Sequence, residues 1–460
     1  MESFNRLTAA SFREKLQRED TPLRRLLAAL FDEGTFAETD AFIGHGGMPD
    51  PVVCGYGAVG GKLTYVFAQD GARQGGFGCN SAAKITAVIG MARRTGAPVI
   101  GIFDSAGAEI CEGAAALSAY GDVMRALSDA AGEIPRIALI TGVCGGAASI
   151  LAGLCDFTVA VKGASLYVNP PFLLKHKGMA ANIGRVSLYA AEQGEAVEKI
   201  RHLLSFLPAN DGDETPYAAS SDDANRLTPE LDAIIAGHTY DAKDVIALLC
   251  DSGSFFEIRP GYAPEMVTGF ARMNGLSIGI CANNPAVLSG AVTPDAARKA
   301  SEWIDYCSAF DIPLLTLCDT YGYDLSEASE SDAYHEALAS LAFSYACADC
   351  PSVTAVLGRA YGAAFTVMGS KSVGADVAIA SDHAVISVME PDAAVQFLYA
   401  DQIRSAGDPA AVRASLTDEW VSGPASPVAA AASGDIDDII PAEAFRQRIA
   451  SAFEALICAR

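Results

Sequence analysis

Basic residues are scarce in this chain of 460 residues, which carries 32 lysines and arginines against 56 aspartates and glutamates. The formal net charge at pH 7 is therefore −24. A surface this negative repels phosphate backbones and anionic lipids, which argues against nucleic acids and membrane surfaces as partners. It leaves a small anionic substrate open, because such a ligand needs only a local pocket that is positive or lined by backbone amides.

Histidine is also rare, with six residues in the whole chain. No Ser-His-Asp arrangement stands out, so a side-chain nucleophile of that type is not expected. His45 and His335 are expected in polar loops, without a carboxylate or a second histidine at the spacing of metal ligands. We therefore expect no metal.

Paired cysteines are nearly absent, since Cys347 and Cys350 form the single C-x-x-C motif. A zinc site of this kind needs a second pair, so packing is the favoured interpretation and zinc the alternative. Most of the 12 cysteines stand alone in apolar runs, as Cys144 and Cys281 do. This usage is typical of reduced core thiols in a cytosolic protein.

Long apolar segments that target or cross a membrane are missing. The first residues contain no apolar run typical of a secretory signal. Residues 137–155 carry no charge, but Gly142, Gly145 and Gly146 interrupt them. This stretch divides naturally into a strand, a tight turn and a buried helix. We expect a cytoplasmic protein.

What the chain does contain is one sequence pattern that occurs twice. The motif Asp-Ser-Ala-Gly at residues 104–107 returns as Asp-Thr-Tyr-Gly at 319–322, and Gly-Gly-Ala-Ala at 145–148 returns as Tyr-Gly-Ala-Ala at 361–364. The offset is about 215 residues, as from Asp104 to Asp319. Because 460 residues with 51% hydrophobic content can build two sizeable cores, each half is expected to be a complete domain.

Strand and helix patterns alternate in each half. Residues 52–69 predict two strands joined at Gly60 and Gly61, and residues 99–103 and 137–140 predict short buried strands. Helices are predicted over residues 82–95, 114–131 and 147–154. The same order recurs over residues 266–379, and the polar residues 208–229 predict an exposed linker. We therefore predict two α/β domains with a boundary near residues 208–240, each with a sheet covered on both faces.

The candidate chemistry lies where predicted strands meet helices. Small residues follow an apolar strand at 104–107 and 144–148, and again at 319–322 and 361–364. The backbone can turn sharply at such residues and leave N–H groups unpaired and pointing outward. Two such amide pairs can form an oxyanion hole, in which each donor contributes roughly a factor of 100 to 1,000 in rate. The alternative is that glycine and alanine only permit close packing of helix on strand.

Four stretches resemble the carboxyltransferase family of biotin-dependent enzymes. They are Asp-Ser-Ala-Gly-Ala-Glu-Ile-Cys-Glu-Gly at 104–113, Cys-Gly-Gly-Ala-Ala-Ser at 144–149, and the longer segments 259–275 and 360–376. The family includes the β subunits of acyl-CoA carboxylases, the transcarboxylase large subunit and the α subunits of sodium-pumping acyl-CoA decarboxylases. The resemblance extends over nearly the whole chain.

This resemblance implies an α/β fold of two tandem crotonase-like domains, residues 1–225 and 226–460. The first domain would hold an acyl-CoA and the second biotin, with the active site at a dimer interface between the N-terminal domain of one subunit and the C-terminal domain of its neighbour. Carboxyl transfer places negative charge on a thioester oxygen and on a ureido oxygen, so two oxyanion holes are needed. The residues assigned to the thioester oxygen are Ala106, Gly107, Gly146 and Ala147, and those assigned to the ureido oxygen are Gly322, Ala363 and Ala364.

Further candidates for substrate binding are Gly75, Gly76, Lys84 and Thr366. Gly75 and Gly76 resemble family positions near CoA, and a solvated turn explains them equally. Lys84 recurs in register as Lys299 and could meet phosphates, but an exposed helix face is the favoured interpretation. Thr366 replaces an aspartate that the family often carries and that helps to choose the acyl group.

Other features also depart from the family pattern. Glu109 stands where the family has arginine, which reverses the charge near the expected acyl-CoA entrance. Residues 324–332 form a short acidic loop in place of a longer stretch with basic residues. Because of these changes, the identity of the acyl group of the substrate does not follow from the resemblance.

The leading hypothesis is a carboxyltransferase subunit of a decarboxylase or carboxylase complex that acts on a short acyl-CoA, such as methylmalonyl-CoA or propionyl-CoA. The sequence has no Ala-Met-Lys-Met biotin-attachment motif and no ATP-grasp domain. Biotin must therefore arrive on a carrier protein. Further partners would be a biotin carboxylase subunit or a membrane sodium-pump subunit, the latter making the protein peripheral to a membrane. One alternative is a crotonase-type hydratase or isomerase with Glu109 and Glu112 as acid and base, and another is an inactive scaffold subunit.

Overall fold

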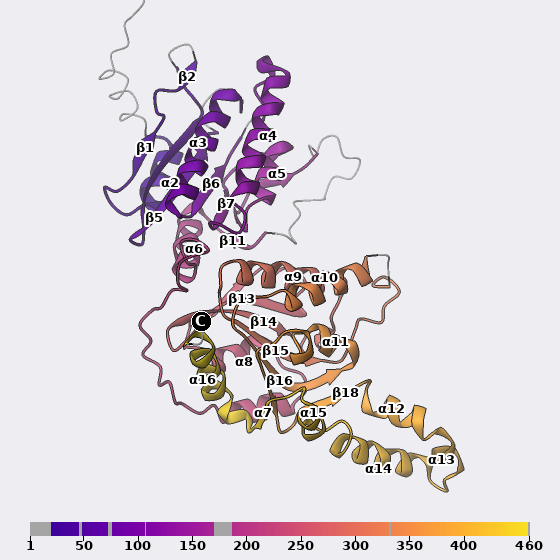
Figure 1. Ribbon diagram of the computed structural model, residues 1–460. Helices are drawn as coiled ribbons and strands as arrows, with labels where there is room; N and C mark the ends of the chain where they lie inside the picture. Colours follow the sequence, from indigo (N-terminus) through magenta and orange to yellow (C-terminus); the bar gives the residue numbers. More distant parts are fainter. Residues whose placement is uncertain are drawn as a thin grey trace, which may run out of the picture. The chain divides into compact units, whose positions relative to one another are not determined.

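The computed structural model describes residues 20–45, 48–71, 76–105, 107–169, 186–330 and 333–458. These residues form two compact units, divided between Glu214 and Thr215 (Figure 1). The division falls within the stretch of residues 208–240 where the sequence predicts a boundary.

Unit 1 contains a seven-stranded sheet. The two strands that meet at Gly60 and Gly61 are antiparallel, as predicted, and the later strands are parallel. In spatial order the strands are β1 (Ala37–Thr39), β4 (Val52–Val59), β5 (Lys62–Gln69), β6 (Val99–Phe103), β7 (Arg136–Ile140), β9 (Phe157–Val161) and β11 (Leu188–Ala190). A short parallel pair, β8 (Val143–Gly145) with β10 (Ser165–Tyr167), lies beyond the end of β7, and β2 (Gly44–His45) pairs with β3 (Met48–Pro49).

In the part of unit 1 that the structure describes, five α-helices accompany this sheet. They are α2 (Pro22–Leu30), α3 (Cys79–Thr95), α4 (Ala114–Asp129), α5 (Ala147–Gly153) and α6 (Gln193–Phe206). Figure 1 shows α3 and α4 side by side, and their buried residues belong to one apolar core with strands β4 to β7. Helix α3 starts before the predicted residue 82, because the carboxylate of Glu112 accepts the N–H of Cys79 at 2.7 Å and caps the first turn. It ends at Gly96, whose φ of 60° is the left-handed conformation of a C-cap glycine.

Unit 2 repeats the strand order of unit 1. Its main path runs through β12 (Phe256–Ile258), β13 (Met266–Met273), β14 (Leu276–Asn283), β15 (Leu314–Thr320), β16 (Ser352–Tyr361), β17 (Val377–Ser381) and β19 (Asp438–Ile440). The first three strands are antiparallel and the rest are parallel. The strand β18 (Val385–Ser387) pairs with the far end of β16, as β10 does with β8 in unit 1.

Helices cover both faces of this second sheet. On one face lie α7 (Glu230–Ala236), α8 (Ala242–Leu249) and α16 (Phe445–Cys458), which share a core with alternate residues of β13 and β14. On the other face lies α9 (Pro294–Ala309), where Trp303 packs against Phe270 of β13 with ring centroids 4.7 Å apart. Helices α10 (Tyr334–Ala346) and α11 (Gly362–Val367) follow, and α12 (Pro391–Leu398), α13 (Ala400–Ser405) and α14 (Pro409–Ser422) extend away from the sheet of unit 2 (Figure 1). Helix α15 (Pro427–Ser433) follows α14 in the chain.

The two units therefore have the same order of strands, as the repeated sequence predicts, and this duplicated α/β architecture fits two tandem crotonase-like domains. Within the described residues, no helix has both the length and the apolar character needed to cross a bilayer. Two local predictions were wrong, because His45 lies in the short strand β2 and His335 in α10, not in loops.

Candidate active site

The two predicted turns of unit 1, at residues 104–107 and 144–148, lie next to each other. Asp104 follows β6, and its carboxylate accepts the N–H of Val143 at 3.1 Å. The N–H of Ser105 donates to the carbonyl of Val143 at 2.9 Å. Since Val143 begins the segment that leads into α5, the chain after β6 is fixed against the chain after β7.

The equivalent turns of unit 2 meet in the same way. Asp319 near the end of β15 accepts the N–H of Arg359 at 3.1 Å. Tyr321 and Tyr361, which precede the candidate residues of each turn, place their ring centroids 5.8 Å apart. The duplicated motifs thus build a similar strand-end site in each unit.

Some glycines of these motifs serve packing alone. A Cβ on Gly142 would lie 2.1 Å from a carboxylate oxygen of Asp104, and a Cβ on Gly358 would lie 2.7 Å from that of Asp319. Real Cβ atoms do not come this close, so these two glycines make room for the strand-end carboxylates. For these positions the packing interpretation holds.

Other glycines of the same motifs open onto free space. Gly107, Gly146 and Gly322 have φ angles of 106°, 59° and 139°, and a Cβ on any of them would meet no atom of the described residues within 4 Å. Packing therefore does not explain why these positions are glycine. The left-handed region that they occupy does, because it favours glycine. These three residues turn the backbone at the edge of an open site.

The N–H of Gly146 is not an available donor, which corrects the expectation that it points outward unpaired. It donates to the carbonyl of Tyr167 at 3.0 Å, because the β8–β10 pair continues one residue past Gly145. Its neighbour Ala147 is the first residue of α5. The helix supplies no acceptor for the N–H of Ala147, so Gly146 turns the chain and Ala147 is the remaining candidate donor.

In each unit, the glycine that follows the first of the two strands has an N–H group that faces a hydroxyl group. Gly107 donates to the Oγ of Ser105 at 3.1 Å, and Gly322 donates to the Oγ1 of Thr320 at 3.2 Å. The same contact in both units is a further sign of the duplication. Each hydroxyl holds a glycine amide at the strand end.

The candidate donors of the second turn lie at a helix start. Gly362, Ala363 and Ala364 are the first three residues of α11, and the first N–H groups of a helix have no acceptor within it. Ala363 is exposed and Ala364 is buried. Thr366 lies on the same helix with an exposed side chain, so it stands close to the candidate donors along the chain.

Two predicted site residues, Gly75 and Ala106, lie outside the described residues. Gly76 is described, and its N–H donates to the carboxylate of Glu109 at 3.0 Å. A Cβ there would lie 2.5 Å from the backbone nitrogen of Glu109. Gly76 therefore allows the close approach of two chain segments.

Glu109 and Glu112 act as caps in this structure. Glu109 precedes the short 3₁₀ helix Ile110–Glu112 and accepts the N–H groups of Gly76 and Cys111. These bonds lower the pKa of Glu109. A carboxyl group held in its ionised form is a poor general acid, which weakens the hydratase alternative.

Replacing Glu109 with glutamine is expected to leave the catalytic rate nearly unchanged. An essential acid or base at this position would contribute about 10²- to 10⁴-fold. The assay is steady-state carboxyl transfer from an acyl-CoA. A loss of that size, with the fold intact by circular dichroism, would restore the acid–base role.

Lys84 and Lys299 are buried, so the expected exposed helix face was wrong. Their side chains are 2% and 1% exposed. The ammonium group of Lys84 donates to the carbonyl of Val52, and that of Lys299 donates to the carbonyls of Tyr262 and Met266 at 2.7 and 2.6 Å. A buried cation must find such partners, and these bonds join each lysine to backbone carbonyls of the preceding chain segment.

Lys299 makes stability depend on pH in the alkaline range. Burial lowers its pKa to about 8, from 10.5. Between these values the unfolded chain binds more protons than the folded one, so the free energy of unfolding rises with pH, by up to about 3 kcal/mol. Urea unfolding between pH 8 and pH 10.5 should show that Lys299→Met loses this rise, while the control Lys243→Met, at a half-buried surface lysine, keeps it. Equal slopes in all three proteins would contradict the assignment.

Sequence reasoning missed the network beneath the second site. Asp319 is 1% exposed and accepts bonds from the hydroxyl of Tyr240 at 2.9 Å and from the Nε of Arg359 at 3.0 Å. Burial, and after it the charge of Asp319, raises the pKa of Tyr240. No local pattern could have found Tyr240, because it comes from a distant part of the chain. The network fixes the carboxylate at the end of β15.

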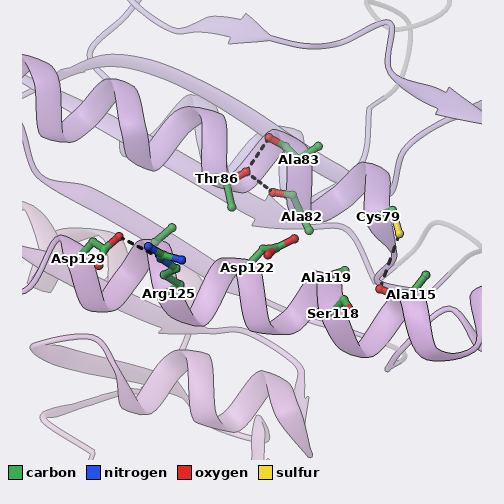
Figure 2. A pocket seen from close by; sticks show the side chains of 11 residues that line it. Cys79, Ala82, Ala83, Thr86, Ala115, Ser118, Ala119, Asp122, Arg125 and Asp129 are labelled. Atoms are coloured by element: carbon green, nitrogen blue, oxygen red, sulfur yellow. Dashed lines mark hydrogen bonds and ion pairs between the residues drawn. The ribbon is translucent and has the colours of Figure 1, made fainter.

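A groove of about 620 Å³ lies between α3 and α4. Figure 2 shows small side chains such as Ala82, Ala83 and Ala119 along it, with Asp122 near the middle and the Arg125–Asp129 ion pair toward one end. It contains none of the predicted oxyanion residues. The candidate site is at the strand ends and not in this groove.

Within the described ranges, one group of side chains could approach a metal ion. Asp232, Asp382 and His383 place their ligand atoms within 4.8 Å of one another, and all three are exposed. The ring of His383 already contacts Asp232 at 2.9 Å, so an ion pair accounts for this cluster. The C-x-x-C motif has one exposed and one buried member, Cys347 and Cys350.

Comparison with known proteins gives one consistent answer. The family model of the carboxyl transferase domain matches residues 17–459. The methylmalonyl-CoA decarboxylase α subunit of Propionigenium modestum is 38% identical over 462 residues, covering 94% of this chain and 89% of that protein. The propionyl-CoA carboxylase carboxyltransferase subunit of Haloferax mediterranei is 36% identical, covering 93% and 88%. Among solved structures, the transcarboxylase 12S hexamer with methylmalonyl-CoA bound superimposes with a TM-score of 0.91 at 33% identity, covering 98% of this chain and 92% of that one.

Proposed function

Because the chain belongs to the carboxyl transferase family, we propose that it moves a carboxylate between a short acyl-CoA and biotin on a carrier protein. The acyl-CoA would be of the methylmalonyl-CoA or propionyl-CoA type, after the names of the relatives. The observation that carries the proposal is the pair of equivalent strand ends, each with a glycine that opens onto free space.

The acyl-CoA reaction needs a donor aimed at one oxygen. When the bond between the α-carbon and the carboxylate breaks, the electron pair spreads onto the thioester oxygen as an enolate. A preorganised N–H group stabilises that charge more strongly than it stabilises the neutral ground state. We assign this role to Ala147 in unit 1, with Gly107 and the predicted Ala106 and Gly75 beside the ligand.

Unit 2 is proposed to hold biotin. When bound, biotin supplies the ureido nitrogen that accepts or returns the carboxylate. Ala363 and Ala364 would donate to its ureido oxygen, with Gly322 beside it, because the N–H of Gly322 already donates to the Oγ1 of Thr320. The open space beside Gly322 fits a ligand there. Thr366, on the same helix, is proposed to influence the choice of acyl group.

Other chains are proposed to complete the enzyme. The biotinyl carrier would come with either a biotin carboxylase subunit or a membrane sodium-pump subunit. Copies of this chain would pair so that unit 1 of one subunit faces unit 2 of the next, which would cover apolar side chains that are exposed in the single chain, such as Ile110 and Val388. The 12 free cysteines support a reducing compartment, the cytoplasm.

Carboxyl transfer to free biotin is the test of the function. The purified protein should transfer labelled carboxylate from methylmalonyl-CoA or malonyl-CoA to biotin. A protein that transfers none and instead hydrates an enoyl-CoA is a crotonase-type hydratase. One that does neither, even with its carrier and partner subunits, fits the scaffold alternative.

A further inference from the structure

A strained turn lies beside the proposed biotin site. Leu288, Ser289 and Gly290 all have positive φ angles, of 48°, 55° and 70°. Left-handed backbone is unfavourable for residues with a Cβ, and it seldom extends over successive residues. Such strain persists only where the surrounding structure imposes it, and it gathers at functional sites.

The side chains of this turn do not offset the strain. Leu288 is 58% exposed, and Ser289 is exposed as well. The main chain holds the turn instead, because the carbonyl of Gly290 accepts the side-chain amide of Asn283 at 3.1 Å. A Cβ on Gly290 would lie 2.3 Å from the carbonyl oxygen of Asp319. The turn is therefore packed directly against the end of β15.

Its contacts fall on the residues that lead to the candidate site. The N–H of Tyr321 donates to the carbonyl of Ser289 at 3.3 Å. The carbonyl of Gly322 accepts the N–H of Val292, just after the turn, at 3.0 Å. The turn and the residue just after it thus bond to the backbone on both sides of the Tyr321–Gly322 peptide.

Unit 1 has an equivalent of the second contact. The N–H of Phe77 donates to the carbonyl of Gly107 at 2.8 Å. Phe77 and Val292 are related by the same offset of about 215 residues as the two motifs. Because the contact is repeated at both strand ends, we infer that the backbone positions of Gly107 and Gly322 are constrained in the same way.

We propose that the turn Leu288–Gly290 is a positioning element for Gly322, with Ser289 as the residue whose left-handed backbone sets the direction of the Tyr321–Gly322 peptide. The inference rests on the proposed function, because Gly322 is assigned there to biotin. The turn would act through Gly322 and would not touch the acyl-CoA.

The test compares residues at position 289 by their tolerance of left-handed backbone. Valine avoids this region, whereas glycine and asparagine enter it readily. Ser289→Val is expected to lower kcat/KM for free biotin on the order of 10- to 100-fold through misplacement of the site, with the KM for methylmalonyl-CoA unchanged. Ser289→Gly and Ser289→Asn should restore the biotin kinetics, because they restore the backbone conformation.

The matched control lies near the start of β15, at the opposite end of that strand from Gly322. Asp311, before β15, also has a positive φ, of 48°, so Asp311→Val imposes a similar strain away from the site. It should lower the melting temperature without changing the KM for biotin. If Ser289→Val does not fold, Ser289→Ala takes its place, with a smaller change expected in the same direction.

The outcomes separate the two proposals. A wild-type protein that transfers carboxylate, with position-289 variants that are folded and kinetically unchanged, overturns the positioning role alone. A wild-type protein without transfer overturns the proposed function. In that case hydrogen exchange tests the positioning role of the turn. Ser289→Val should speed exchange at the Tyr321 amide, and Asp311→Val should not. Equal exchange in the two variants would overturn the positioning role as well.

Discussion

Gly146→Ala is expected to lower kcat/KM for carboxyl transfer on the order of 100- to 1,000-fold, the loss typical of a misplaced oxyanion donor. Gly146 has φ 59° and ψ −127°, a conformation that residues with a Cβ avoid. The new Cβ would project into the open space beside the start of α5. The change of backbone conformation would turn the N–H of Ala147 away from the thioester oxygen, and the Cβ would occupy space that the proposed ligand needs. Steady-state kinetics with methylmalonyl-CoA and biotin measures the loss.

The control for this variant lies in the same helix. Gly153 also has free space around a Cβ but no positive φ, so Gly153→Ala should keep full activity and gain roughly 0.5–1 kcal/mol of stability. Activity of Gly146→Ala close to that of the Gly153→Ala control would remove Ala147 from the site.

Arg446→Met is expected to lower the free energy of unfolding by about 3–5 kcal/mol. Arg446 in α16 is fully buried and bonds to Asp251 and to the carbonyl of Leu249, both at 2.7 Å. Burial alone would raise the pKa of Asp251, but its bonds from Arg446 and from the N–H of Gly275 hold that pKa below its usual value. Removing the arginine leaves a buried carboxylate without its cation. Urea unfolding of unit 2 measures the loss.

An exposed pair provides the comparison. Arg404 contacts Asp401 at 3.3 Å, with side chains that are 77% and 96% exposed. Solvent screens this pair, so Arg404→Met should change stability by less than about 1 kcal/mol. A similar small loss for Arg446→Met would show that α16 is not held by the buried ion pair.

The sequence predicts the fold well because its signals are local. The strand pair around Gly60 and Gly61 and the apolar run at 99–103 have clear periodicities, and both appear as predicted. The repeat carries these elements into unit 2, where the strand order is the same. Periodicity and duplication were enough for the architecture.

The buried lysines show where such reasoning fails. A lysine on a helix usually lies in solvent, yet Lys84 and Lys299 reach carbonyl groups of the preceding strand segments. Their partners lie more than 30 residues away, and no spacing rule reports a backbone carbonyl as an acceptor. The burial of a charge depends on tertiary contacts that a single sequence does not display.

The two turns at the strand ends follow from the sequence, but the hydrogen-bond partners of their N–H groups do not. Small residues after strands marked both turns, but the pairing of Gly146 with Tyr167 depends on the short β8–β10 ladder. The strained turn in unit 2 had no signal either, since Leu288 and Ser289 are not residues that favour positive φ. Its conformation is imposed by contacts with β15.

The most direct test of the two-site account is the transfer of labelled carboxylate from methylmalonyl-CoA to free biotin, with both concentrations varied, in Gly107→Ala and Gly322→Ala. These glycines occupy equivalent positions, both with positive φ and both beside open space. The account predicts that Gly107→Ala raises the KM for methylmalonyl-CoA alone, and that Gly322→Ala raises the KM for biotin alone. Two folded variants that impair the same substrate, or neither, would contradict it.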